Sequence, residues 1–155
     1  MAGHKKTPEA PLDTSGLRFA IVVAEFNASI TELLLEGALE CFAKYGVPDE
    51  SVDVRRVPGA FELALASKVL ASGGSYDAIV ALGCVVRGET PHFEYVSQAA
   101  AYGLQRVGLD TGVPVAFGVL TTDDFAQAEA RSGGEHGNKG FDAAQTAVEM
   151  ALFNR

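Results

Sequence analysis

A histidine beside a predicted helix start is the feature of this sequence best suited to chemistry. Residues 88–91 form a short polar segment after the apolar run 78–82, and His92 follows them. Thr90 is a good N-cap and Pro91 a good first helical residue, which predicts that a helix begins here. The free N–H groups of a helix start attract anions, phosphate above all, and histidine readily transfers protons near neutral pH. We therefore expect an enzyme acting on a small phosphorylated substrate, although a polar residue at a helix start also suits a purely structural role.

Alternating strand and helix patterns must position this histidine. Such alternation predicts right-handed crossovers and therefore an α/β fold, a three-layer α/β/α sandwich of flavodoxin-like type with a four-stranded parallel sheet. The predicted strands are Arg18–Ala24, Val52–Val57 (at an edge), Asp77–Gly83 and Pro114–Leu120. The predicted helices are Ser29–Tyr45 with a capping box over Ser29–Glu32, Pro58–Leu70, His92–Leu109, Asp124–Arg131, and one over Phe141–Leu152 after the loop Ser132–Gly140.

Polar clusters accompany the ends of all four predicted strands. They are Glu25–Asn27, Pro58–Glu62, residues 88–92 and Phe117–Thr122. Because ligands of such sheets bind beyond the carboxyl ends of the strands, we expect these clusters to share one rim. There Phe26 could stack on a flat heteroaromatic ring, and Asn27 and Glu62 could hydrogen-bond to the edge of that ring. Taken singly, Phe26, Phe61 and Phe117 would also suit a hydrophobic core.

Composition and charge narrow the classes of function. The chain has 155 residues and a formal net charge of −8, which argues against nucleic acid or an anionic membrane as the main partner. Cys41 and Cys84 lack metal-ligand spacing, so we expect no metal site, two free thiols and a cytoplasmic location. Cys41 suits core packing, and Cys84 suits packing against core or ligand. Residues 1–16 are predicted to be a flexible arm and residues 17–155 a single domain.

Five segments in chain order strengthen this interpretation. They are Glu25–Asn27, Val57–Glu62, Arg87–Val96, Phe117–Thr122 and Gly137–Gly140. Together they resemble the 6,7-dimethyl-8-ribityllumazine synthase family, over a span from about Arg18 to the C-terminus. The resemblance implies the penultimate step of riboflavin biosynthesis, in which 5-amino-6-(D-ribitylamino)uracil condenses with 3,4-dihydroxy-2-butanone 4-phosphate to give the lumazine, phosphate and water. It implies small-molecule substrates and neither a metal nor an organic cofactor.

The resemblance also gives roles to individual residues. His92 would transfer protons. The pyrimidine and ribityl pocket would be lined by Phe26, Asn27, Ala60, Phe61, Glu62, Cys84, Val85 and Val86, with Phe117 closing over the ring from the adjacent subunit. The phosphate would meet the backbone of Gly88, Glu89 and Thr90, together with Arg131 of the adjacent subunit and nearby Lys139. We expect the Glu89 side chain to point to solvent, because a carboxylate would repel phosphate.

An oligomer follows from the same resemblance. It implies a homo-pentamer with active sites between neighbouring subunits, and the short loop Ser132–Asn138 resembles members in which twelve pentamers close into a shell of sixty subunits. The small residues Ala99–Gly103 would suit a crowded five-fold axis. Arg55 and Arg56 suit either an edge strand kept soluble by charge or a subunit interface. The resemblance leaves open whether such a shell encloses riboflavin synthase as a partner.

Two other classes of function share much of this pattern. A flavin- or lumazine-binding protein that has lost turnover would keep the pocket, and a shell-forming protein would keep the interfaces. Retention of Thr90, His92 and Arg131 favours the synthase over the binding protein, whereas an activity assay would separate the synthase from a shell-forming protein. A flavodoxin-like electron carrier fits less well, because it would have no use for the pair His92 and Arg131.

Overall fold

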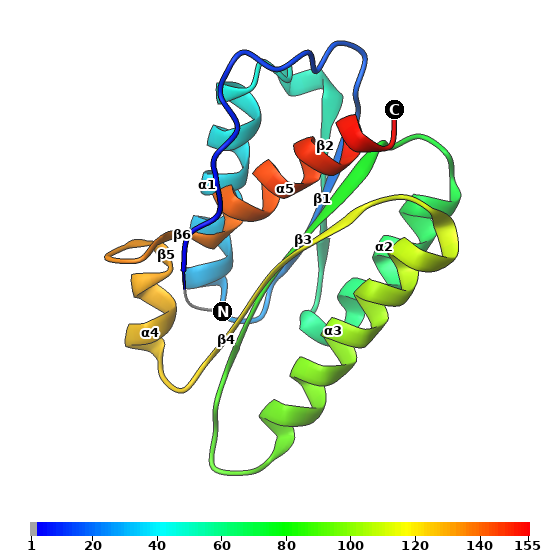
Figure 1. Cartoon of the computed structure of the whole chain (residues 1–155). Coiled ribbons are helices and arrows are strands. Elements are labelled where there is room, and N and C mark those ends of the chain that lie inside the picture. Colours follow the sequence, from blue (N-terminus) through cyan, green and yellow to red (C-terminus); the bar gives the residue numbers. More distant parts are fainter. Residues whose placement is uncertain (1–2) are drawn as a thin grey trace.

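A four-stranded parallel sheet with the strand order β2-β1-β3-β4 organises the chain. The computed structural model describes residues 3–155 and places helices on both faces of this sheet (Figure 1). Its strands are β1 (Phe19–Ala24), β2 (Val52–Val57), β3 (Ala78–Val86) and β4 (Val115–Thr122). The helices are α1 (Ala28–Lys44), α2 (Leu63–Ser72), α3 (His92–Thr111), α4 (Phe125–Ala130) and α5 (Lys139–Phe153). The predicted α/β fold is confirmed, and β2 is an edge strand as its alternating pattern predicted.

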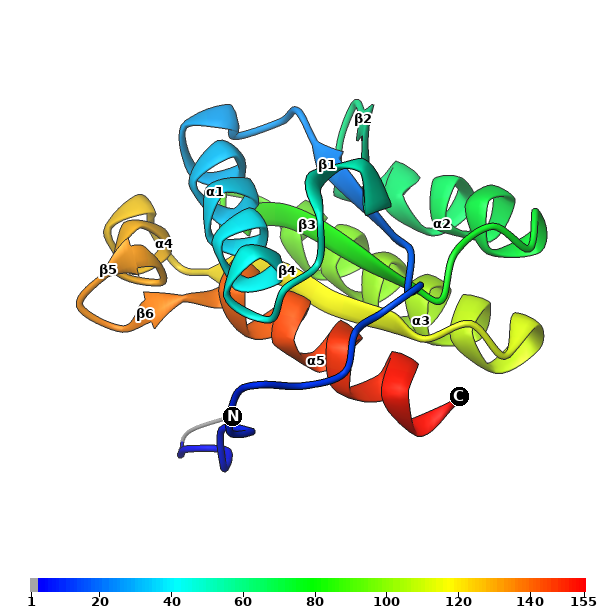
Figure 2. The same cartoon turned by 90° about the horizontal axis from the view of Figure 1, so that it is seen from above.

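The two faces of the sheet carry separate apolar cores. Phe19, Ile21 and Val23 of β1 face the core under α1 and α5, whereas Ala20 and Val22 face the core under α2 and α3. Figure 2 shows the two helix pairs on opposite sides of the strands. A strand that is covered on both faces must be apolar at every position, which explains the unbroken apolar run of β1. The sequence pattern therefore selects the three-layer arrangement.

Small residues set how closely the layers approach. A Cβ built on Gly103 of α3 would lie 2.6 Å from the Cβ of Ala64 in α2, and one on Gly118 of β4 would lie 2.5 Å from Leu82. Both distances are too short for any larger side chain. The close approach at Gly103 is thus made with α2 of the same chain. The five-fold axis suggested by the run Ala99–Gly103 stays a prediction.

Two predicted helix caps are wrong. Helix α1 begins at Ala28, so Ser29 lies inside the helix, and the N-cap is Asn27 in a left-handed conformation without a side-chain cap bond. Helix α3 begins at His92, and its N-cap position is occupied by Pro91, which leaves Thr90 outside. In both cases backbone turn geometry starts the helix, whereas the prediction relied on a hydroxyl side chain. His92 is therefore the first helical residue.

Other boundaries shift by a few residues. The helix expected from Pro58 begins at Leu63, and a 3₁₀ turn, η2 (Ala60–Glu62), precedes it. Strand β3 runs to Val86, three residues beyond the predicted Gly83, because β4 continues to pair with it. A second 3₁₀ turn, η1 (Asp49–Ser51), leads into β2.

The predicted loop before the last helix contains a small hairpin. Strands β5 (Ser132–Gly134) and β6 (Gly137–Asn138) pair antiparallel. Asn138 caps α5, because its Oδ1 accepts hydrogen bonds from the amides of Gly140 (2.8 Å) and Phe141 (3.2 Å). Its Nδ2 donates to the carbonyl oxygen of Leu33 in α1 (2.9 Å). The hairpin and α5 are thereby fixed against α1.

The described part of the N-terminal arm contacts α1 and α5. Thr14 Oγ1 donates to the buried carbonyl oxygen of Tyr45 (2.9 Å), and Lys5 forms an ion pair with Glu149 (2.6 Å). Met1 and Ala2 lie outside the described residues, and the flexibility of the arm stays a prediction. Among residues 3–155, no helix is long and apolar enough to cross a membrane.

Candidate active site

The segments after β1 and β2 meet at the carboxyl rim of the sheet, the lower edge in Figure 1. The amide of Glu25 donates to the carbonyl oxygen of Val57 (2.8 Å), and the amide of Phe26 donates to that of Pro58 (2.9 Å). These bonds continue the pairing of β1 with β2 beyond the last strand residues. Phe26 is therefore held by backbone bonds at the rim, although its side chain points away from the core.

Asn27 ties the same segment to β3. Its backbone is left-handed (φ 60°, ψ 47°), a conformation that asparagine tolerates better than most residues. Its side-chain Nδ2 donates to the carbonyl oxygen of Cys84 (2.8 Å). The amide nitrogen is thus partly occupied, and no hydrogen bond from residues 3–155 occupies the side-chain carbonyl oxygen, which can accept one from a ligand.

An aromatic face and a carboxylate lie together beside Gly59. A Cβ built on Gly59 would stand 3.3 Å from Glu62 Oε2 and 3.9 Å from the Cβ of Phe26. The side chains of Phe26 and Phe61 are 71% and 64% exposed, whereas Ala60 is buried. Large exposed aromatic rings next to a hydrogen-bond acceptor form a surface on which a flat, N–H-bearing ring can stack and bond.

The segment between β3 and α3 presents free backbone donors. Within residues 3–155, the amides of Gly88, Glu89 and Thr90 make no backbone hydrogen bond, and the amide of Glu94 closes the first turn of α3 on Pro91 (3.0 Å). A Cβ on Gly88 would meet nothing within 4 Å, so there is open space beside the loop. Free amides at the start of a 20-residue helix favour an anion.

The side chains of His92 and Glu89 are both exposed at this segment. His92 is exposed as the first residue of α3. Glu89 is also exposed in the single chain, as expected for a carboxylate that must avoid a bound anion. The loop can therefore offer N–H groups to an anion, and His92 follows Thr90 by two positions in the chain.

Arg87 joins both ends of this loop to their surroundings. Its amide donates to the carbonyl oxygen of Thr122 (2.8 Å), and its Nε donates to Asp123 Oδ1 (2.9 Å). Nη1 lies 3.7 Å from Glu94 Oε1, and the guanidinium carbon lies 4.5 Å from the centre of the Phe93 ring. One side chain thus connects the end of β3, the turn before α4 and the first turn of α3.

Cys84, Val85 and Val86 form the end of β3 beneath the rim. Cys84 is buried, and Val85 and Val86 are half-buried. Burial raises the pKa of the Cys84 thiol to about 11, so the thiol is neutral near neutral pH and suits packing rather than nucleophilic attack. Both cysteines are free, and Cys41 lies in the core with its pKa raised to about 12, mainly by burial.

Phe117, Arg131 and Lys139 lie away from this group. Phe117 is the third residue of β4, so the expectation that it sits at the strand end with Phe26 is wrong for a single chain. Arg131 follows α4, which packs through Ala128 against the core under α1 and α5, on the opposite face from α3. The amide of Lys139 donates to the carbonyl oxygen of Arg131 (2.9 Å), which joins the backbones of these two residues.

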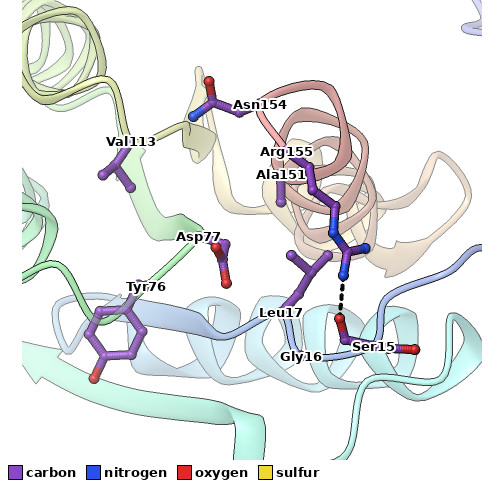
Figure 3. Close-up of a pocket in the computed structure, with 9 residues that line it drawn as sticks. All are labelled: Ser15, Gly16, Leu17, Tyr76, Asp77, Val113, Ala151, Asn154 and Arg155. Atoms are coloured by element: carbon purple, nitrogen blue, oxygen red, sulfur yellow. Dashed lines mark hydrogen bonds between the residues drawn. The ribbon is translucent and has the colours of Figure 1, made fainter.

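A hollow of about 260 Å³ lies at the opposite, amino-terminal edge of the sheet (Figure 3). Its polar groups are already used to join chain segments. Arg155 donates to the carbonyl oxygens of Ser15 and Asp13, the latter at 2.9 Å, and Asp77 Oδ2 accepts from the amide of Arg18 (2.8 Å). These bonds hold the entry to β1 against the C-terminus, so the candidate active site is the carboxyl rim. Across the described chain, no three His, Cys, Asp or Glu side chains gather to hold a metal ion.

Comparison with known proteins shows the family of the chain. The family model described as 6,7-dimethyl-8-ribityllumazine synthase matches residues 16–155. The chain belongs to this family. A protein of Chlorobium phaeobacteroides named 6,7-dimethyl-8-ribityllumazine synthase is 50% identical over 150 residues, which cover 97% of each chain. The family resemblance carried by the five segments is therefore confirmed.

The contacts of Arg87 in this member of the lumazine synthase family were not predicted from the sequence. Arg87 was noted only as part of a family segment, and its partner Asp123 lies 36 positions away. The pairing follows from the register of β3 with β4, in which Val86 opposes Thr122. The only signal in the sequence is an arginine directly before a glycine-containing anion loop.

Proposed function

We propose that this chain catalyses the reaction for which its family is named, the condensation of 5-amino-6-(D-ribitylamino)uracil with 3,4-dihydroxy-2-butanone 4-phosphate to 6,7-dimethyl-8-ribityllumazine. Membership of the family supports the reaction. The observation that carries the assignment of the site is the convergence of three features at one rim: the exposed Phe26 and Phe61 rings, the free amides of residues 88–90, and His92.

The pyrimidine binds on the side of the rim formed after β1 and β2. Phe26 stacks on the ring, and Glu62 and the free carbonyl oxygen of Asn27 accept hydrogen bonds from its N–H groups. The ribityl chain runs along Ala60, Phe61 and the end of β3 at Cys84, Val85 and Val86. The support for this placement is the proximity of Phe26, Gly59 and Glu62 and the bond from Asn27 to Cys84.

The phosphate of the second substrate binds at the start of α3. The amides of Gly88, Glu89 and Thr90 donate to its oxygens, and the helix dipole favours its negative charge. The reacting carbons then lie between the phosphate and the pyrimidine amine. Holding two substrates in this way supplies much of the rate acceleration by converting a bimolecular reaction into a local one.

Three chemical steps follow from this arrangement. The 5-amino group attacks the ketone carbon, and loss of water gives an imine. Removal of the proton next to the imine lets the phosphate leave with the electrons of its C–O bond, and the resulting enol becomes a ketone. The ribitylamino nitrogen attacks that ketone, and loss of a second water closes the ring. His92 moves these protons, and the amides with a cation stabilise the departing phosphate.

The site is completed by a second copy of the chain. Phe26 and Phe61 are too exposed in one chain to exclude water from a bound ring. Phe117, Arg131 and Lys139 lie away from the rim of their own subunit but belong to the same family segments or their neighbours. We place Phe117 over the pyrimidine of the adjacent subunit and Arg131 with Lys139 at its phosphate.

The oligomer that brings the copies together is a pentamer. Exposed apolar side chains line the outer surfaces of α2 and α3, which pack side by side (Figure 1). They are Leu65, Val69, Tyr95, Tyr102 and Leu109. Patches of this kind mark contacts between proteins. In a closed ring, each subunit contributes Phe117, Arg131 and Lys139 to one neighbour and receives the same residues from the other, so every site is complete. Twelve such rings form a shell in the cytoplasm.

Mixing the two substrates with the purified protein tests the reaction. Appearance of the absorbance and fluorescence of the lumazine, with release of inorganic phosphate in equal amount, is the expected result. Binding of the lumazine without turnover would reject the enzyme in favour of a carrier. Light scattering tests the assembly, and a species of one subunit only would reject the shared site.

A further inference from the structure

We propose that Arg87 is a positioning residue that withholds two carboxylates, Asp123 and Glu94, from the phosphate of the substrate; this inference rests on the proposed function. Arg87 immediately precedes the loop 88–90, whose free amides are the phosphate donors. Its guanidinium pairs with Asp123 and Glu94, and its plane lies against Phe93. The positioning residue therefore acts on the anion site through its partners.

The charges around the loop make such a residue necessary. Glu89, Glu94 and Asp123 are three carboxylates within or directly beside the anion site, and Arg87 is the cation bonded among them. A dianionic phosphate within a Debye length of unpaired carboxylates is repelled, because screening over that distance is incomplete. Pairing with one guanidinium lowers the negative potential that two of the three carboxylates impose on the loop.

The contacts of the Arg87 side chain favour this role over direct binding of phosphate. Nε of Arg87 donates to Asp123 at 2.9 Å, Nη1 lies 3.7 Å from Glu94 Oε1, and the guanidinium carbon lies over the Phe93 ring, 4.5 Å from its centre. A guanidinium held between two carboxylates can bind phosphate only in competition with them. The contact with β4 through the Arg87 amide is made by the backbone and survives a change of side chain.

A charge-restoration series tests the proposal. Arg87→Ala exposes both carboxylates, so the Kd of inorganic phosphate and the KM for the butanone phosphate should rise about five- to twentyfold at low salt, as expected for two unpaired surface charges. The KM for the pyrimidine should stay within about twofold, because its site lies after β1 and β2. Combining Arg87→Ala with Asp123→Asn and Glu94→Gln should return phosphate affinity to within about twofold of the unaltered protein.

A matched control removes the same number of negative charges at a distant surface. Arg87→Ala combined with Glu36→Gln and Glu40→Gln on the exposed face of α1 has the same net charge, and it should keep the weakened phosphate binding. Equal restoration by this control, or no restoration by the first triple variant, would overturn the proposal and assign Arg87 to phosphate contact or to folding. Calorimetric binding of inorganic phosphate needs no turnover, so it tests Arg87 even if the proposed reaction fails.

Discussion

The side-chain amide of Asn27 donates a hydrogen bond to the carbonyl oxygen of Cys84 across 2.8 Å, and this bond joins the start of α1 to the end of β3. The two residues are 57 positions apart. The bond holds the segment that carries Phe26 at a fixed place relative to the strand that leads into the anion loop. The pyrimidine side and the phosphate side of the proposed site therefore share one rigid connection.

Substitution of Asn27 should separate its backbone role from its side-chain role. Asn27→Gly keeps the left-handed conformation and loses only the bond to Cys84, at a cost of about 1 kcal/mol in unfolding free energy. Asn27→Ala loses both and should cost about 1 kcal/mol more, because alanine is strained in that conformation. Urea unfolding at one fixed protein concentration measures the difference. Equal stability of the two variants would show that the left-handed backbone carries no cost here.

His92→Ala should slow turnover about 100-fold or more, the scale of lost general acid–base catalysis. The affinity for inorganic phosphate should stay within a few fold, because the loop amides are unchanged. Steady-state kinetics and phosphate inhibition measure the two effects. Unchanged turnover would remove His92 from the mechanism, whereas a loss of phosphate binding equal to the loss of turnover would make it a phosphate ligand.

Arg131→Ala should raise the KM for the butanone phosphate by about tenfold or more and leave the KM for the pyrimidine unchanged, since a charged hydrogen bond to phosphate is lost. Lys44→Ala is a matched control, because it removes one exposed positive charge from the end of α1. Its kinetics should match those of the unaltered protein. If the two variants have the same KM, Arg131 does not contact the phosphate.

Alkaline pH should destabilise the fold through Cys84. Burial raises its pKa from 9.0 to about 11, so the folded state favours the neutral thiol. The stabilisation is fully present below about pH 9 and is lost as pH rises through about 11, which amounts to about 3 kcal/mol. Urea unfolding at pH 8 and about pH 10.5 should show a smaller loss for Cys84→Ser than for the unaltered protein. Equal losses would contradict the buried thiol as the source.

The sheet could be predicted from the sequence because its strands have a one-dimensional signature. The run from Phe19 to Ala24 is apolar at every position, and the range predicted for β2 is the one observed. Helix starts were harder. Ser29 and Thr90 have the chemistry of caps, but a left-handed Asn27 and the turn at Pro91 begin the helices instead. Such turns depend on tertiary contacts, including the bond from Asn27 to Cys84.

The site was predictable where its residues follow strands and not where they depend on pairing across the sheet. Phe26 and His92 lie on the rim that the strand ends predicted. Phe117 lies away from that rim, because it is the third residue of β4 and pairs with Ala81 inside β3. The contact between Arg87 and Asp123 depends on the register of β3 with β4, which no local pattern encodes.

The most direct test of the shared site mixes two defective subunits. His92→Ala chains retain Arg131, and Arg131→Ala chains retain His92, so co-assembly in equal amounts should give intact sites at about one quarter of all positions in a closed ring. At low concentrations of the butanone phosphate, the mixed assembly should therefore recover about one quarter of the unaltered activity. Activity no greater than the mean of the two separate variants would contradict an active site built from two subunits.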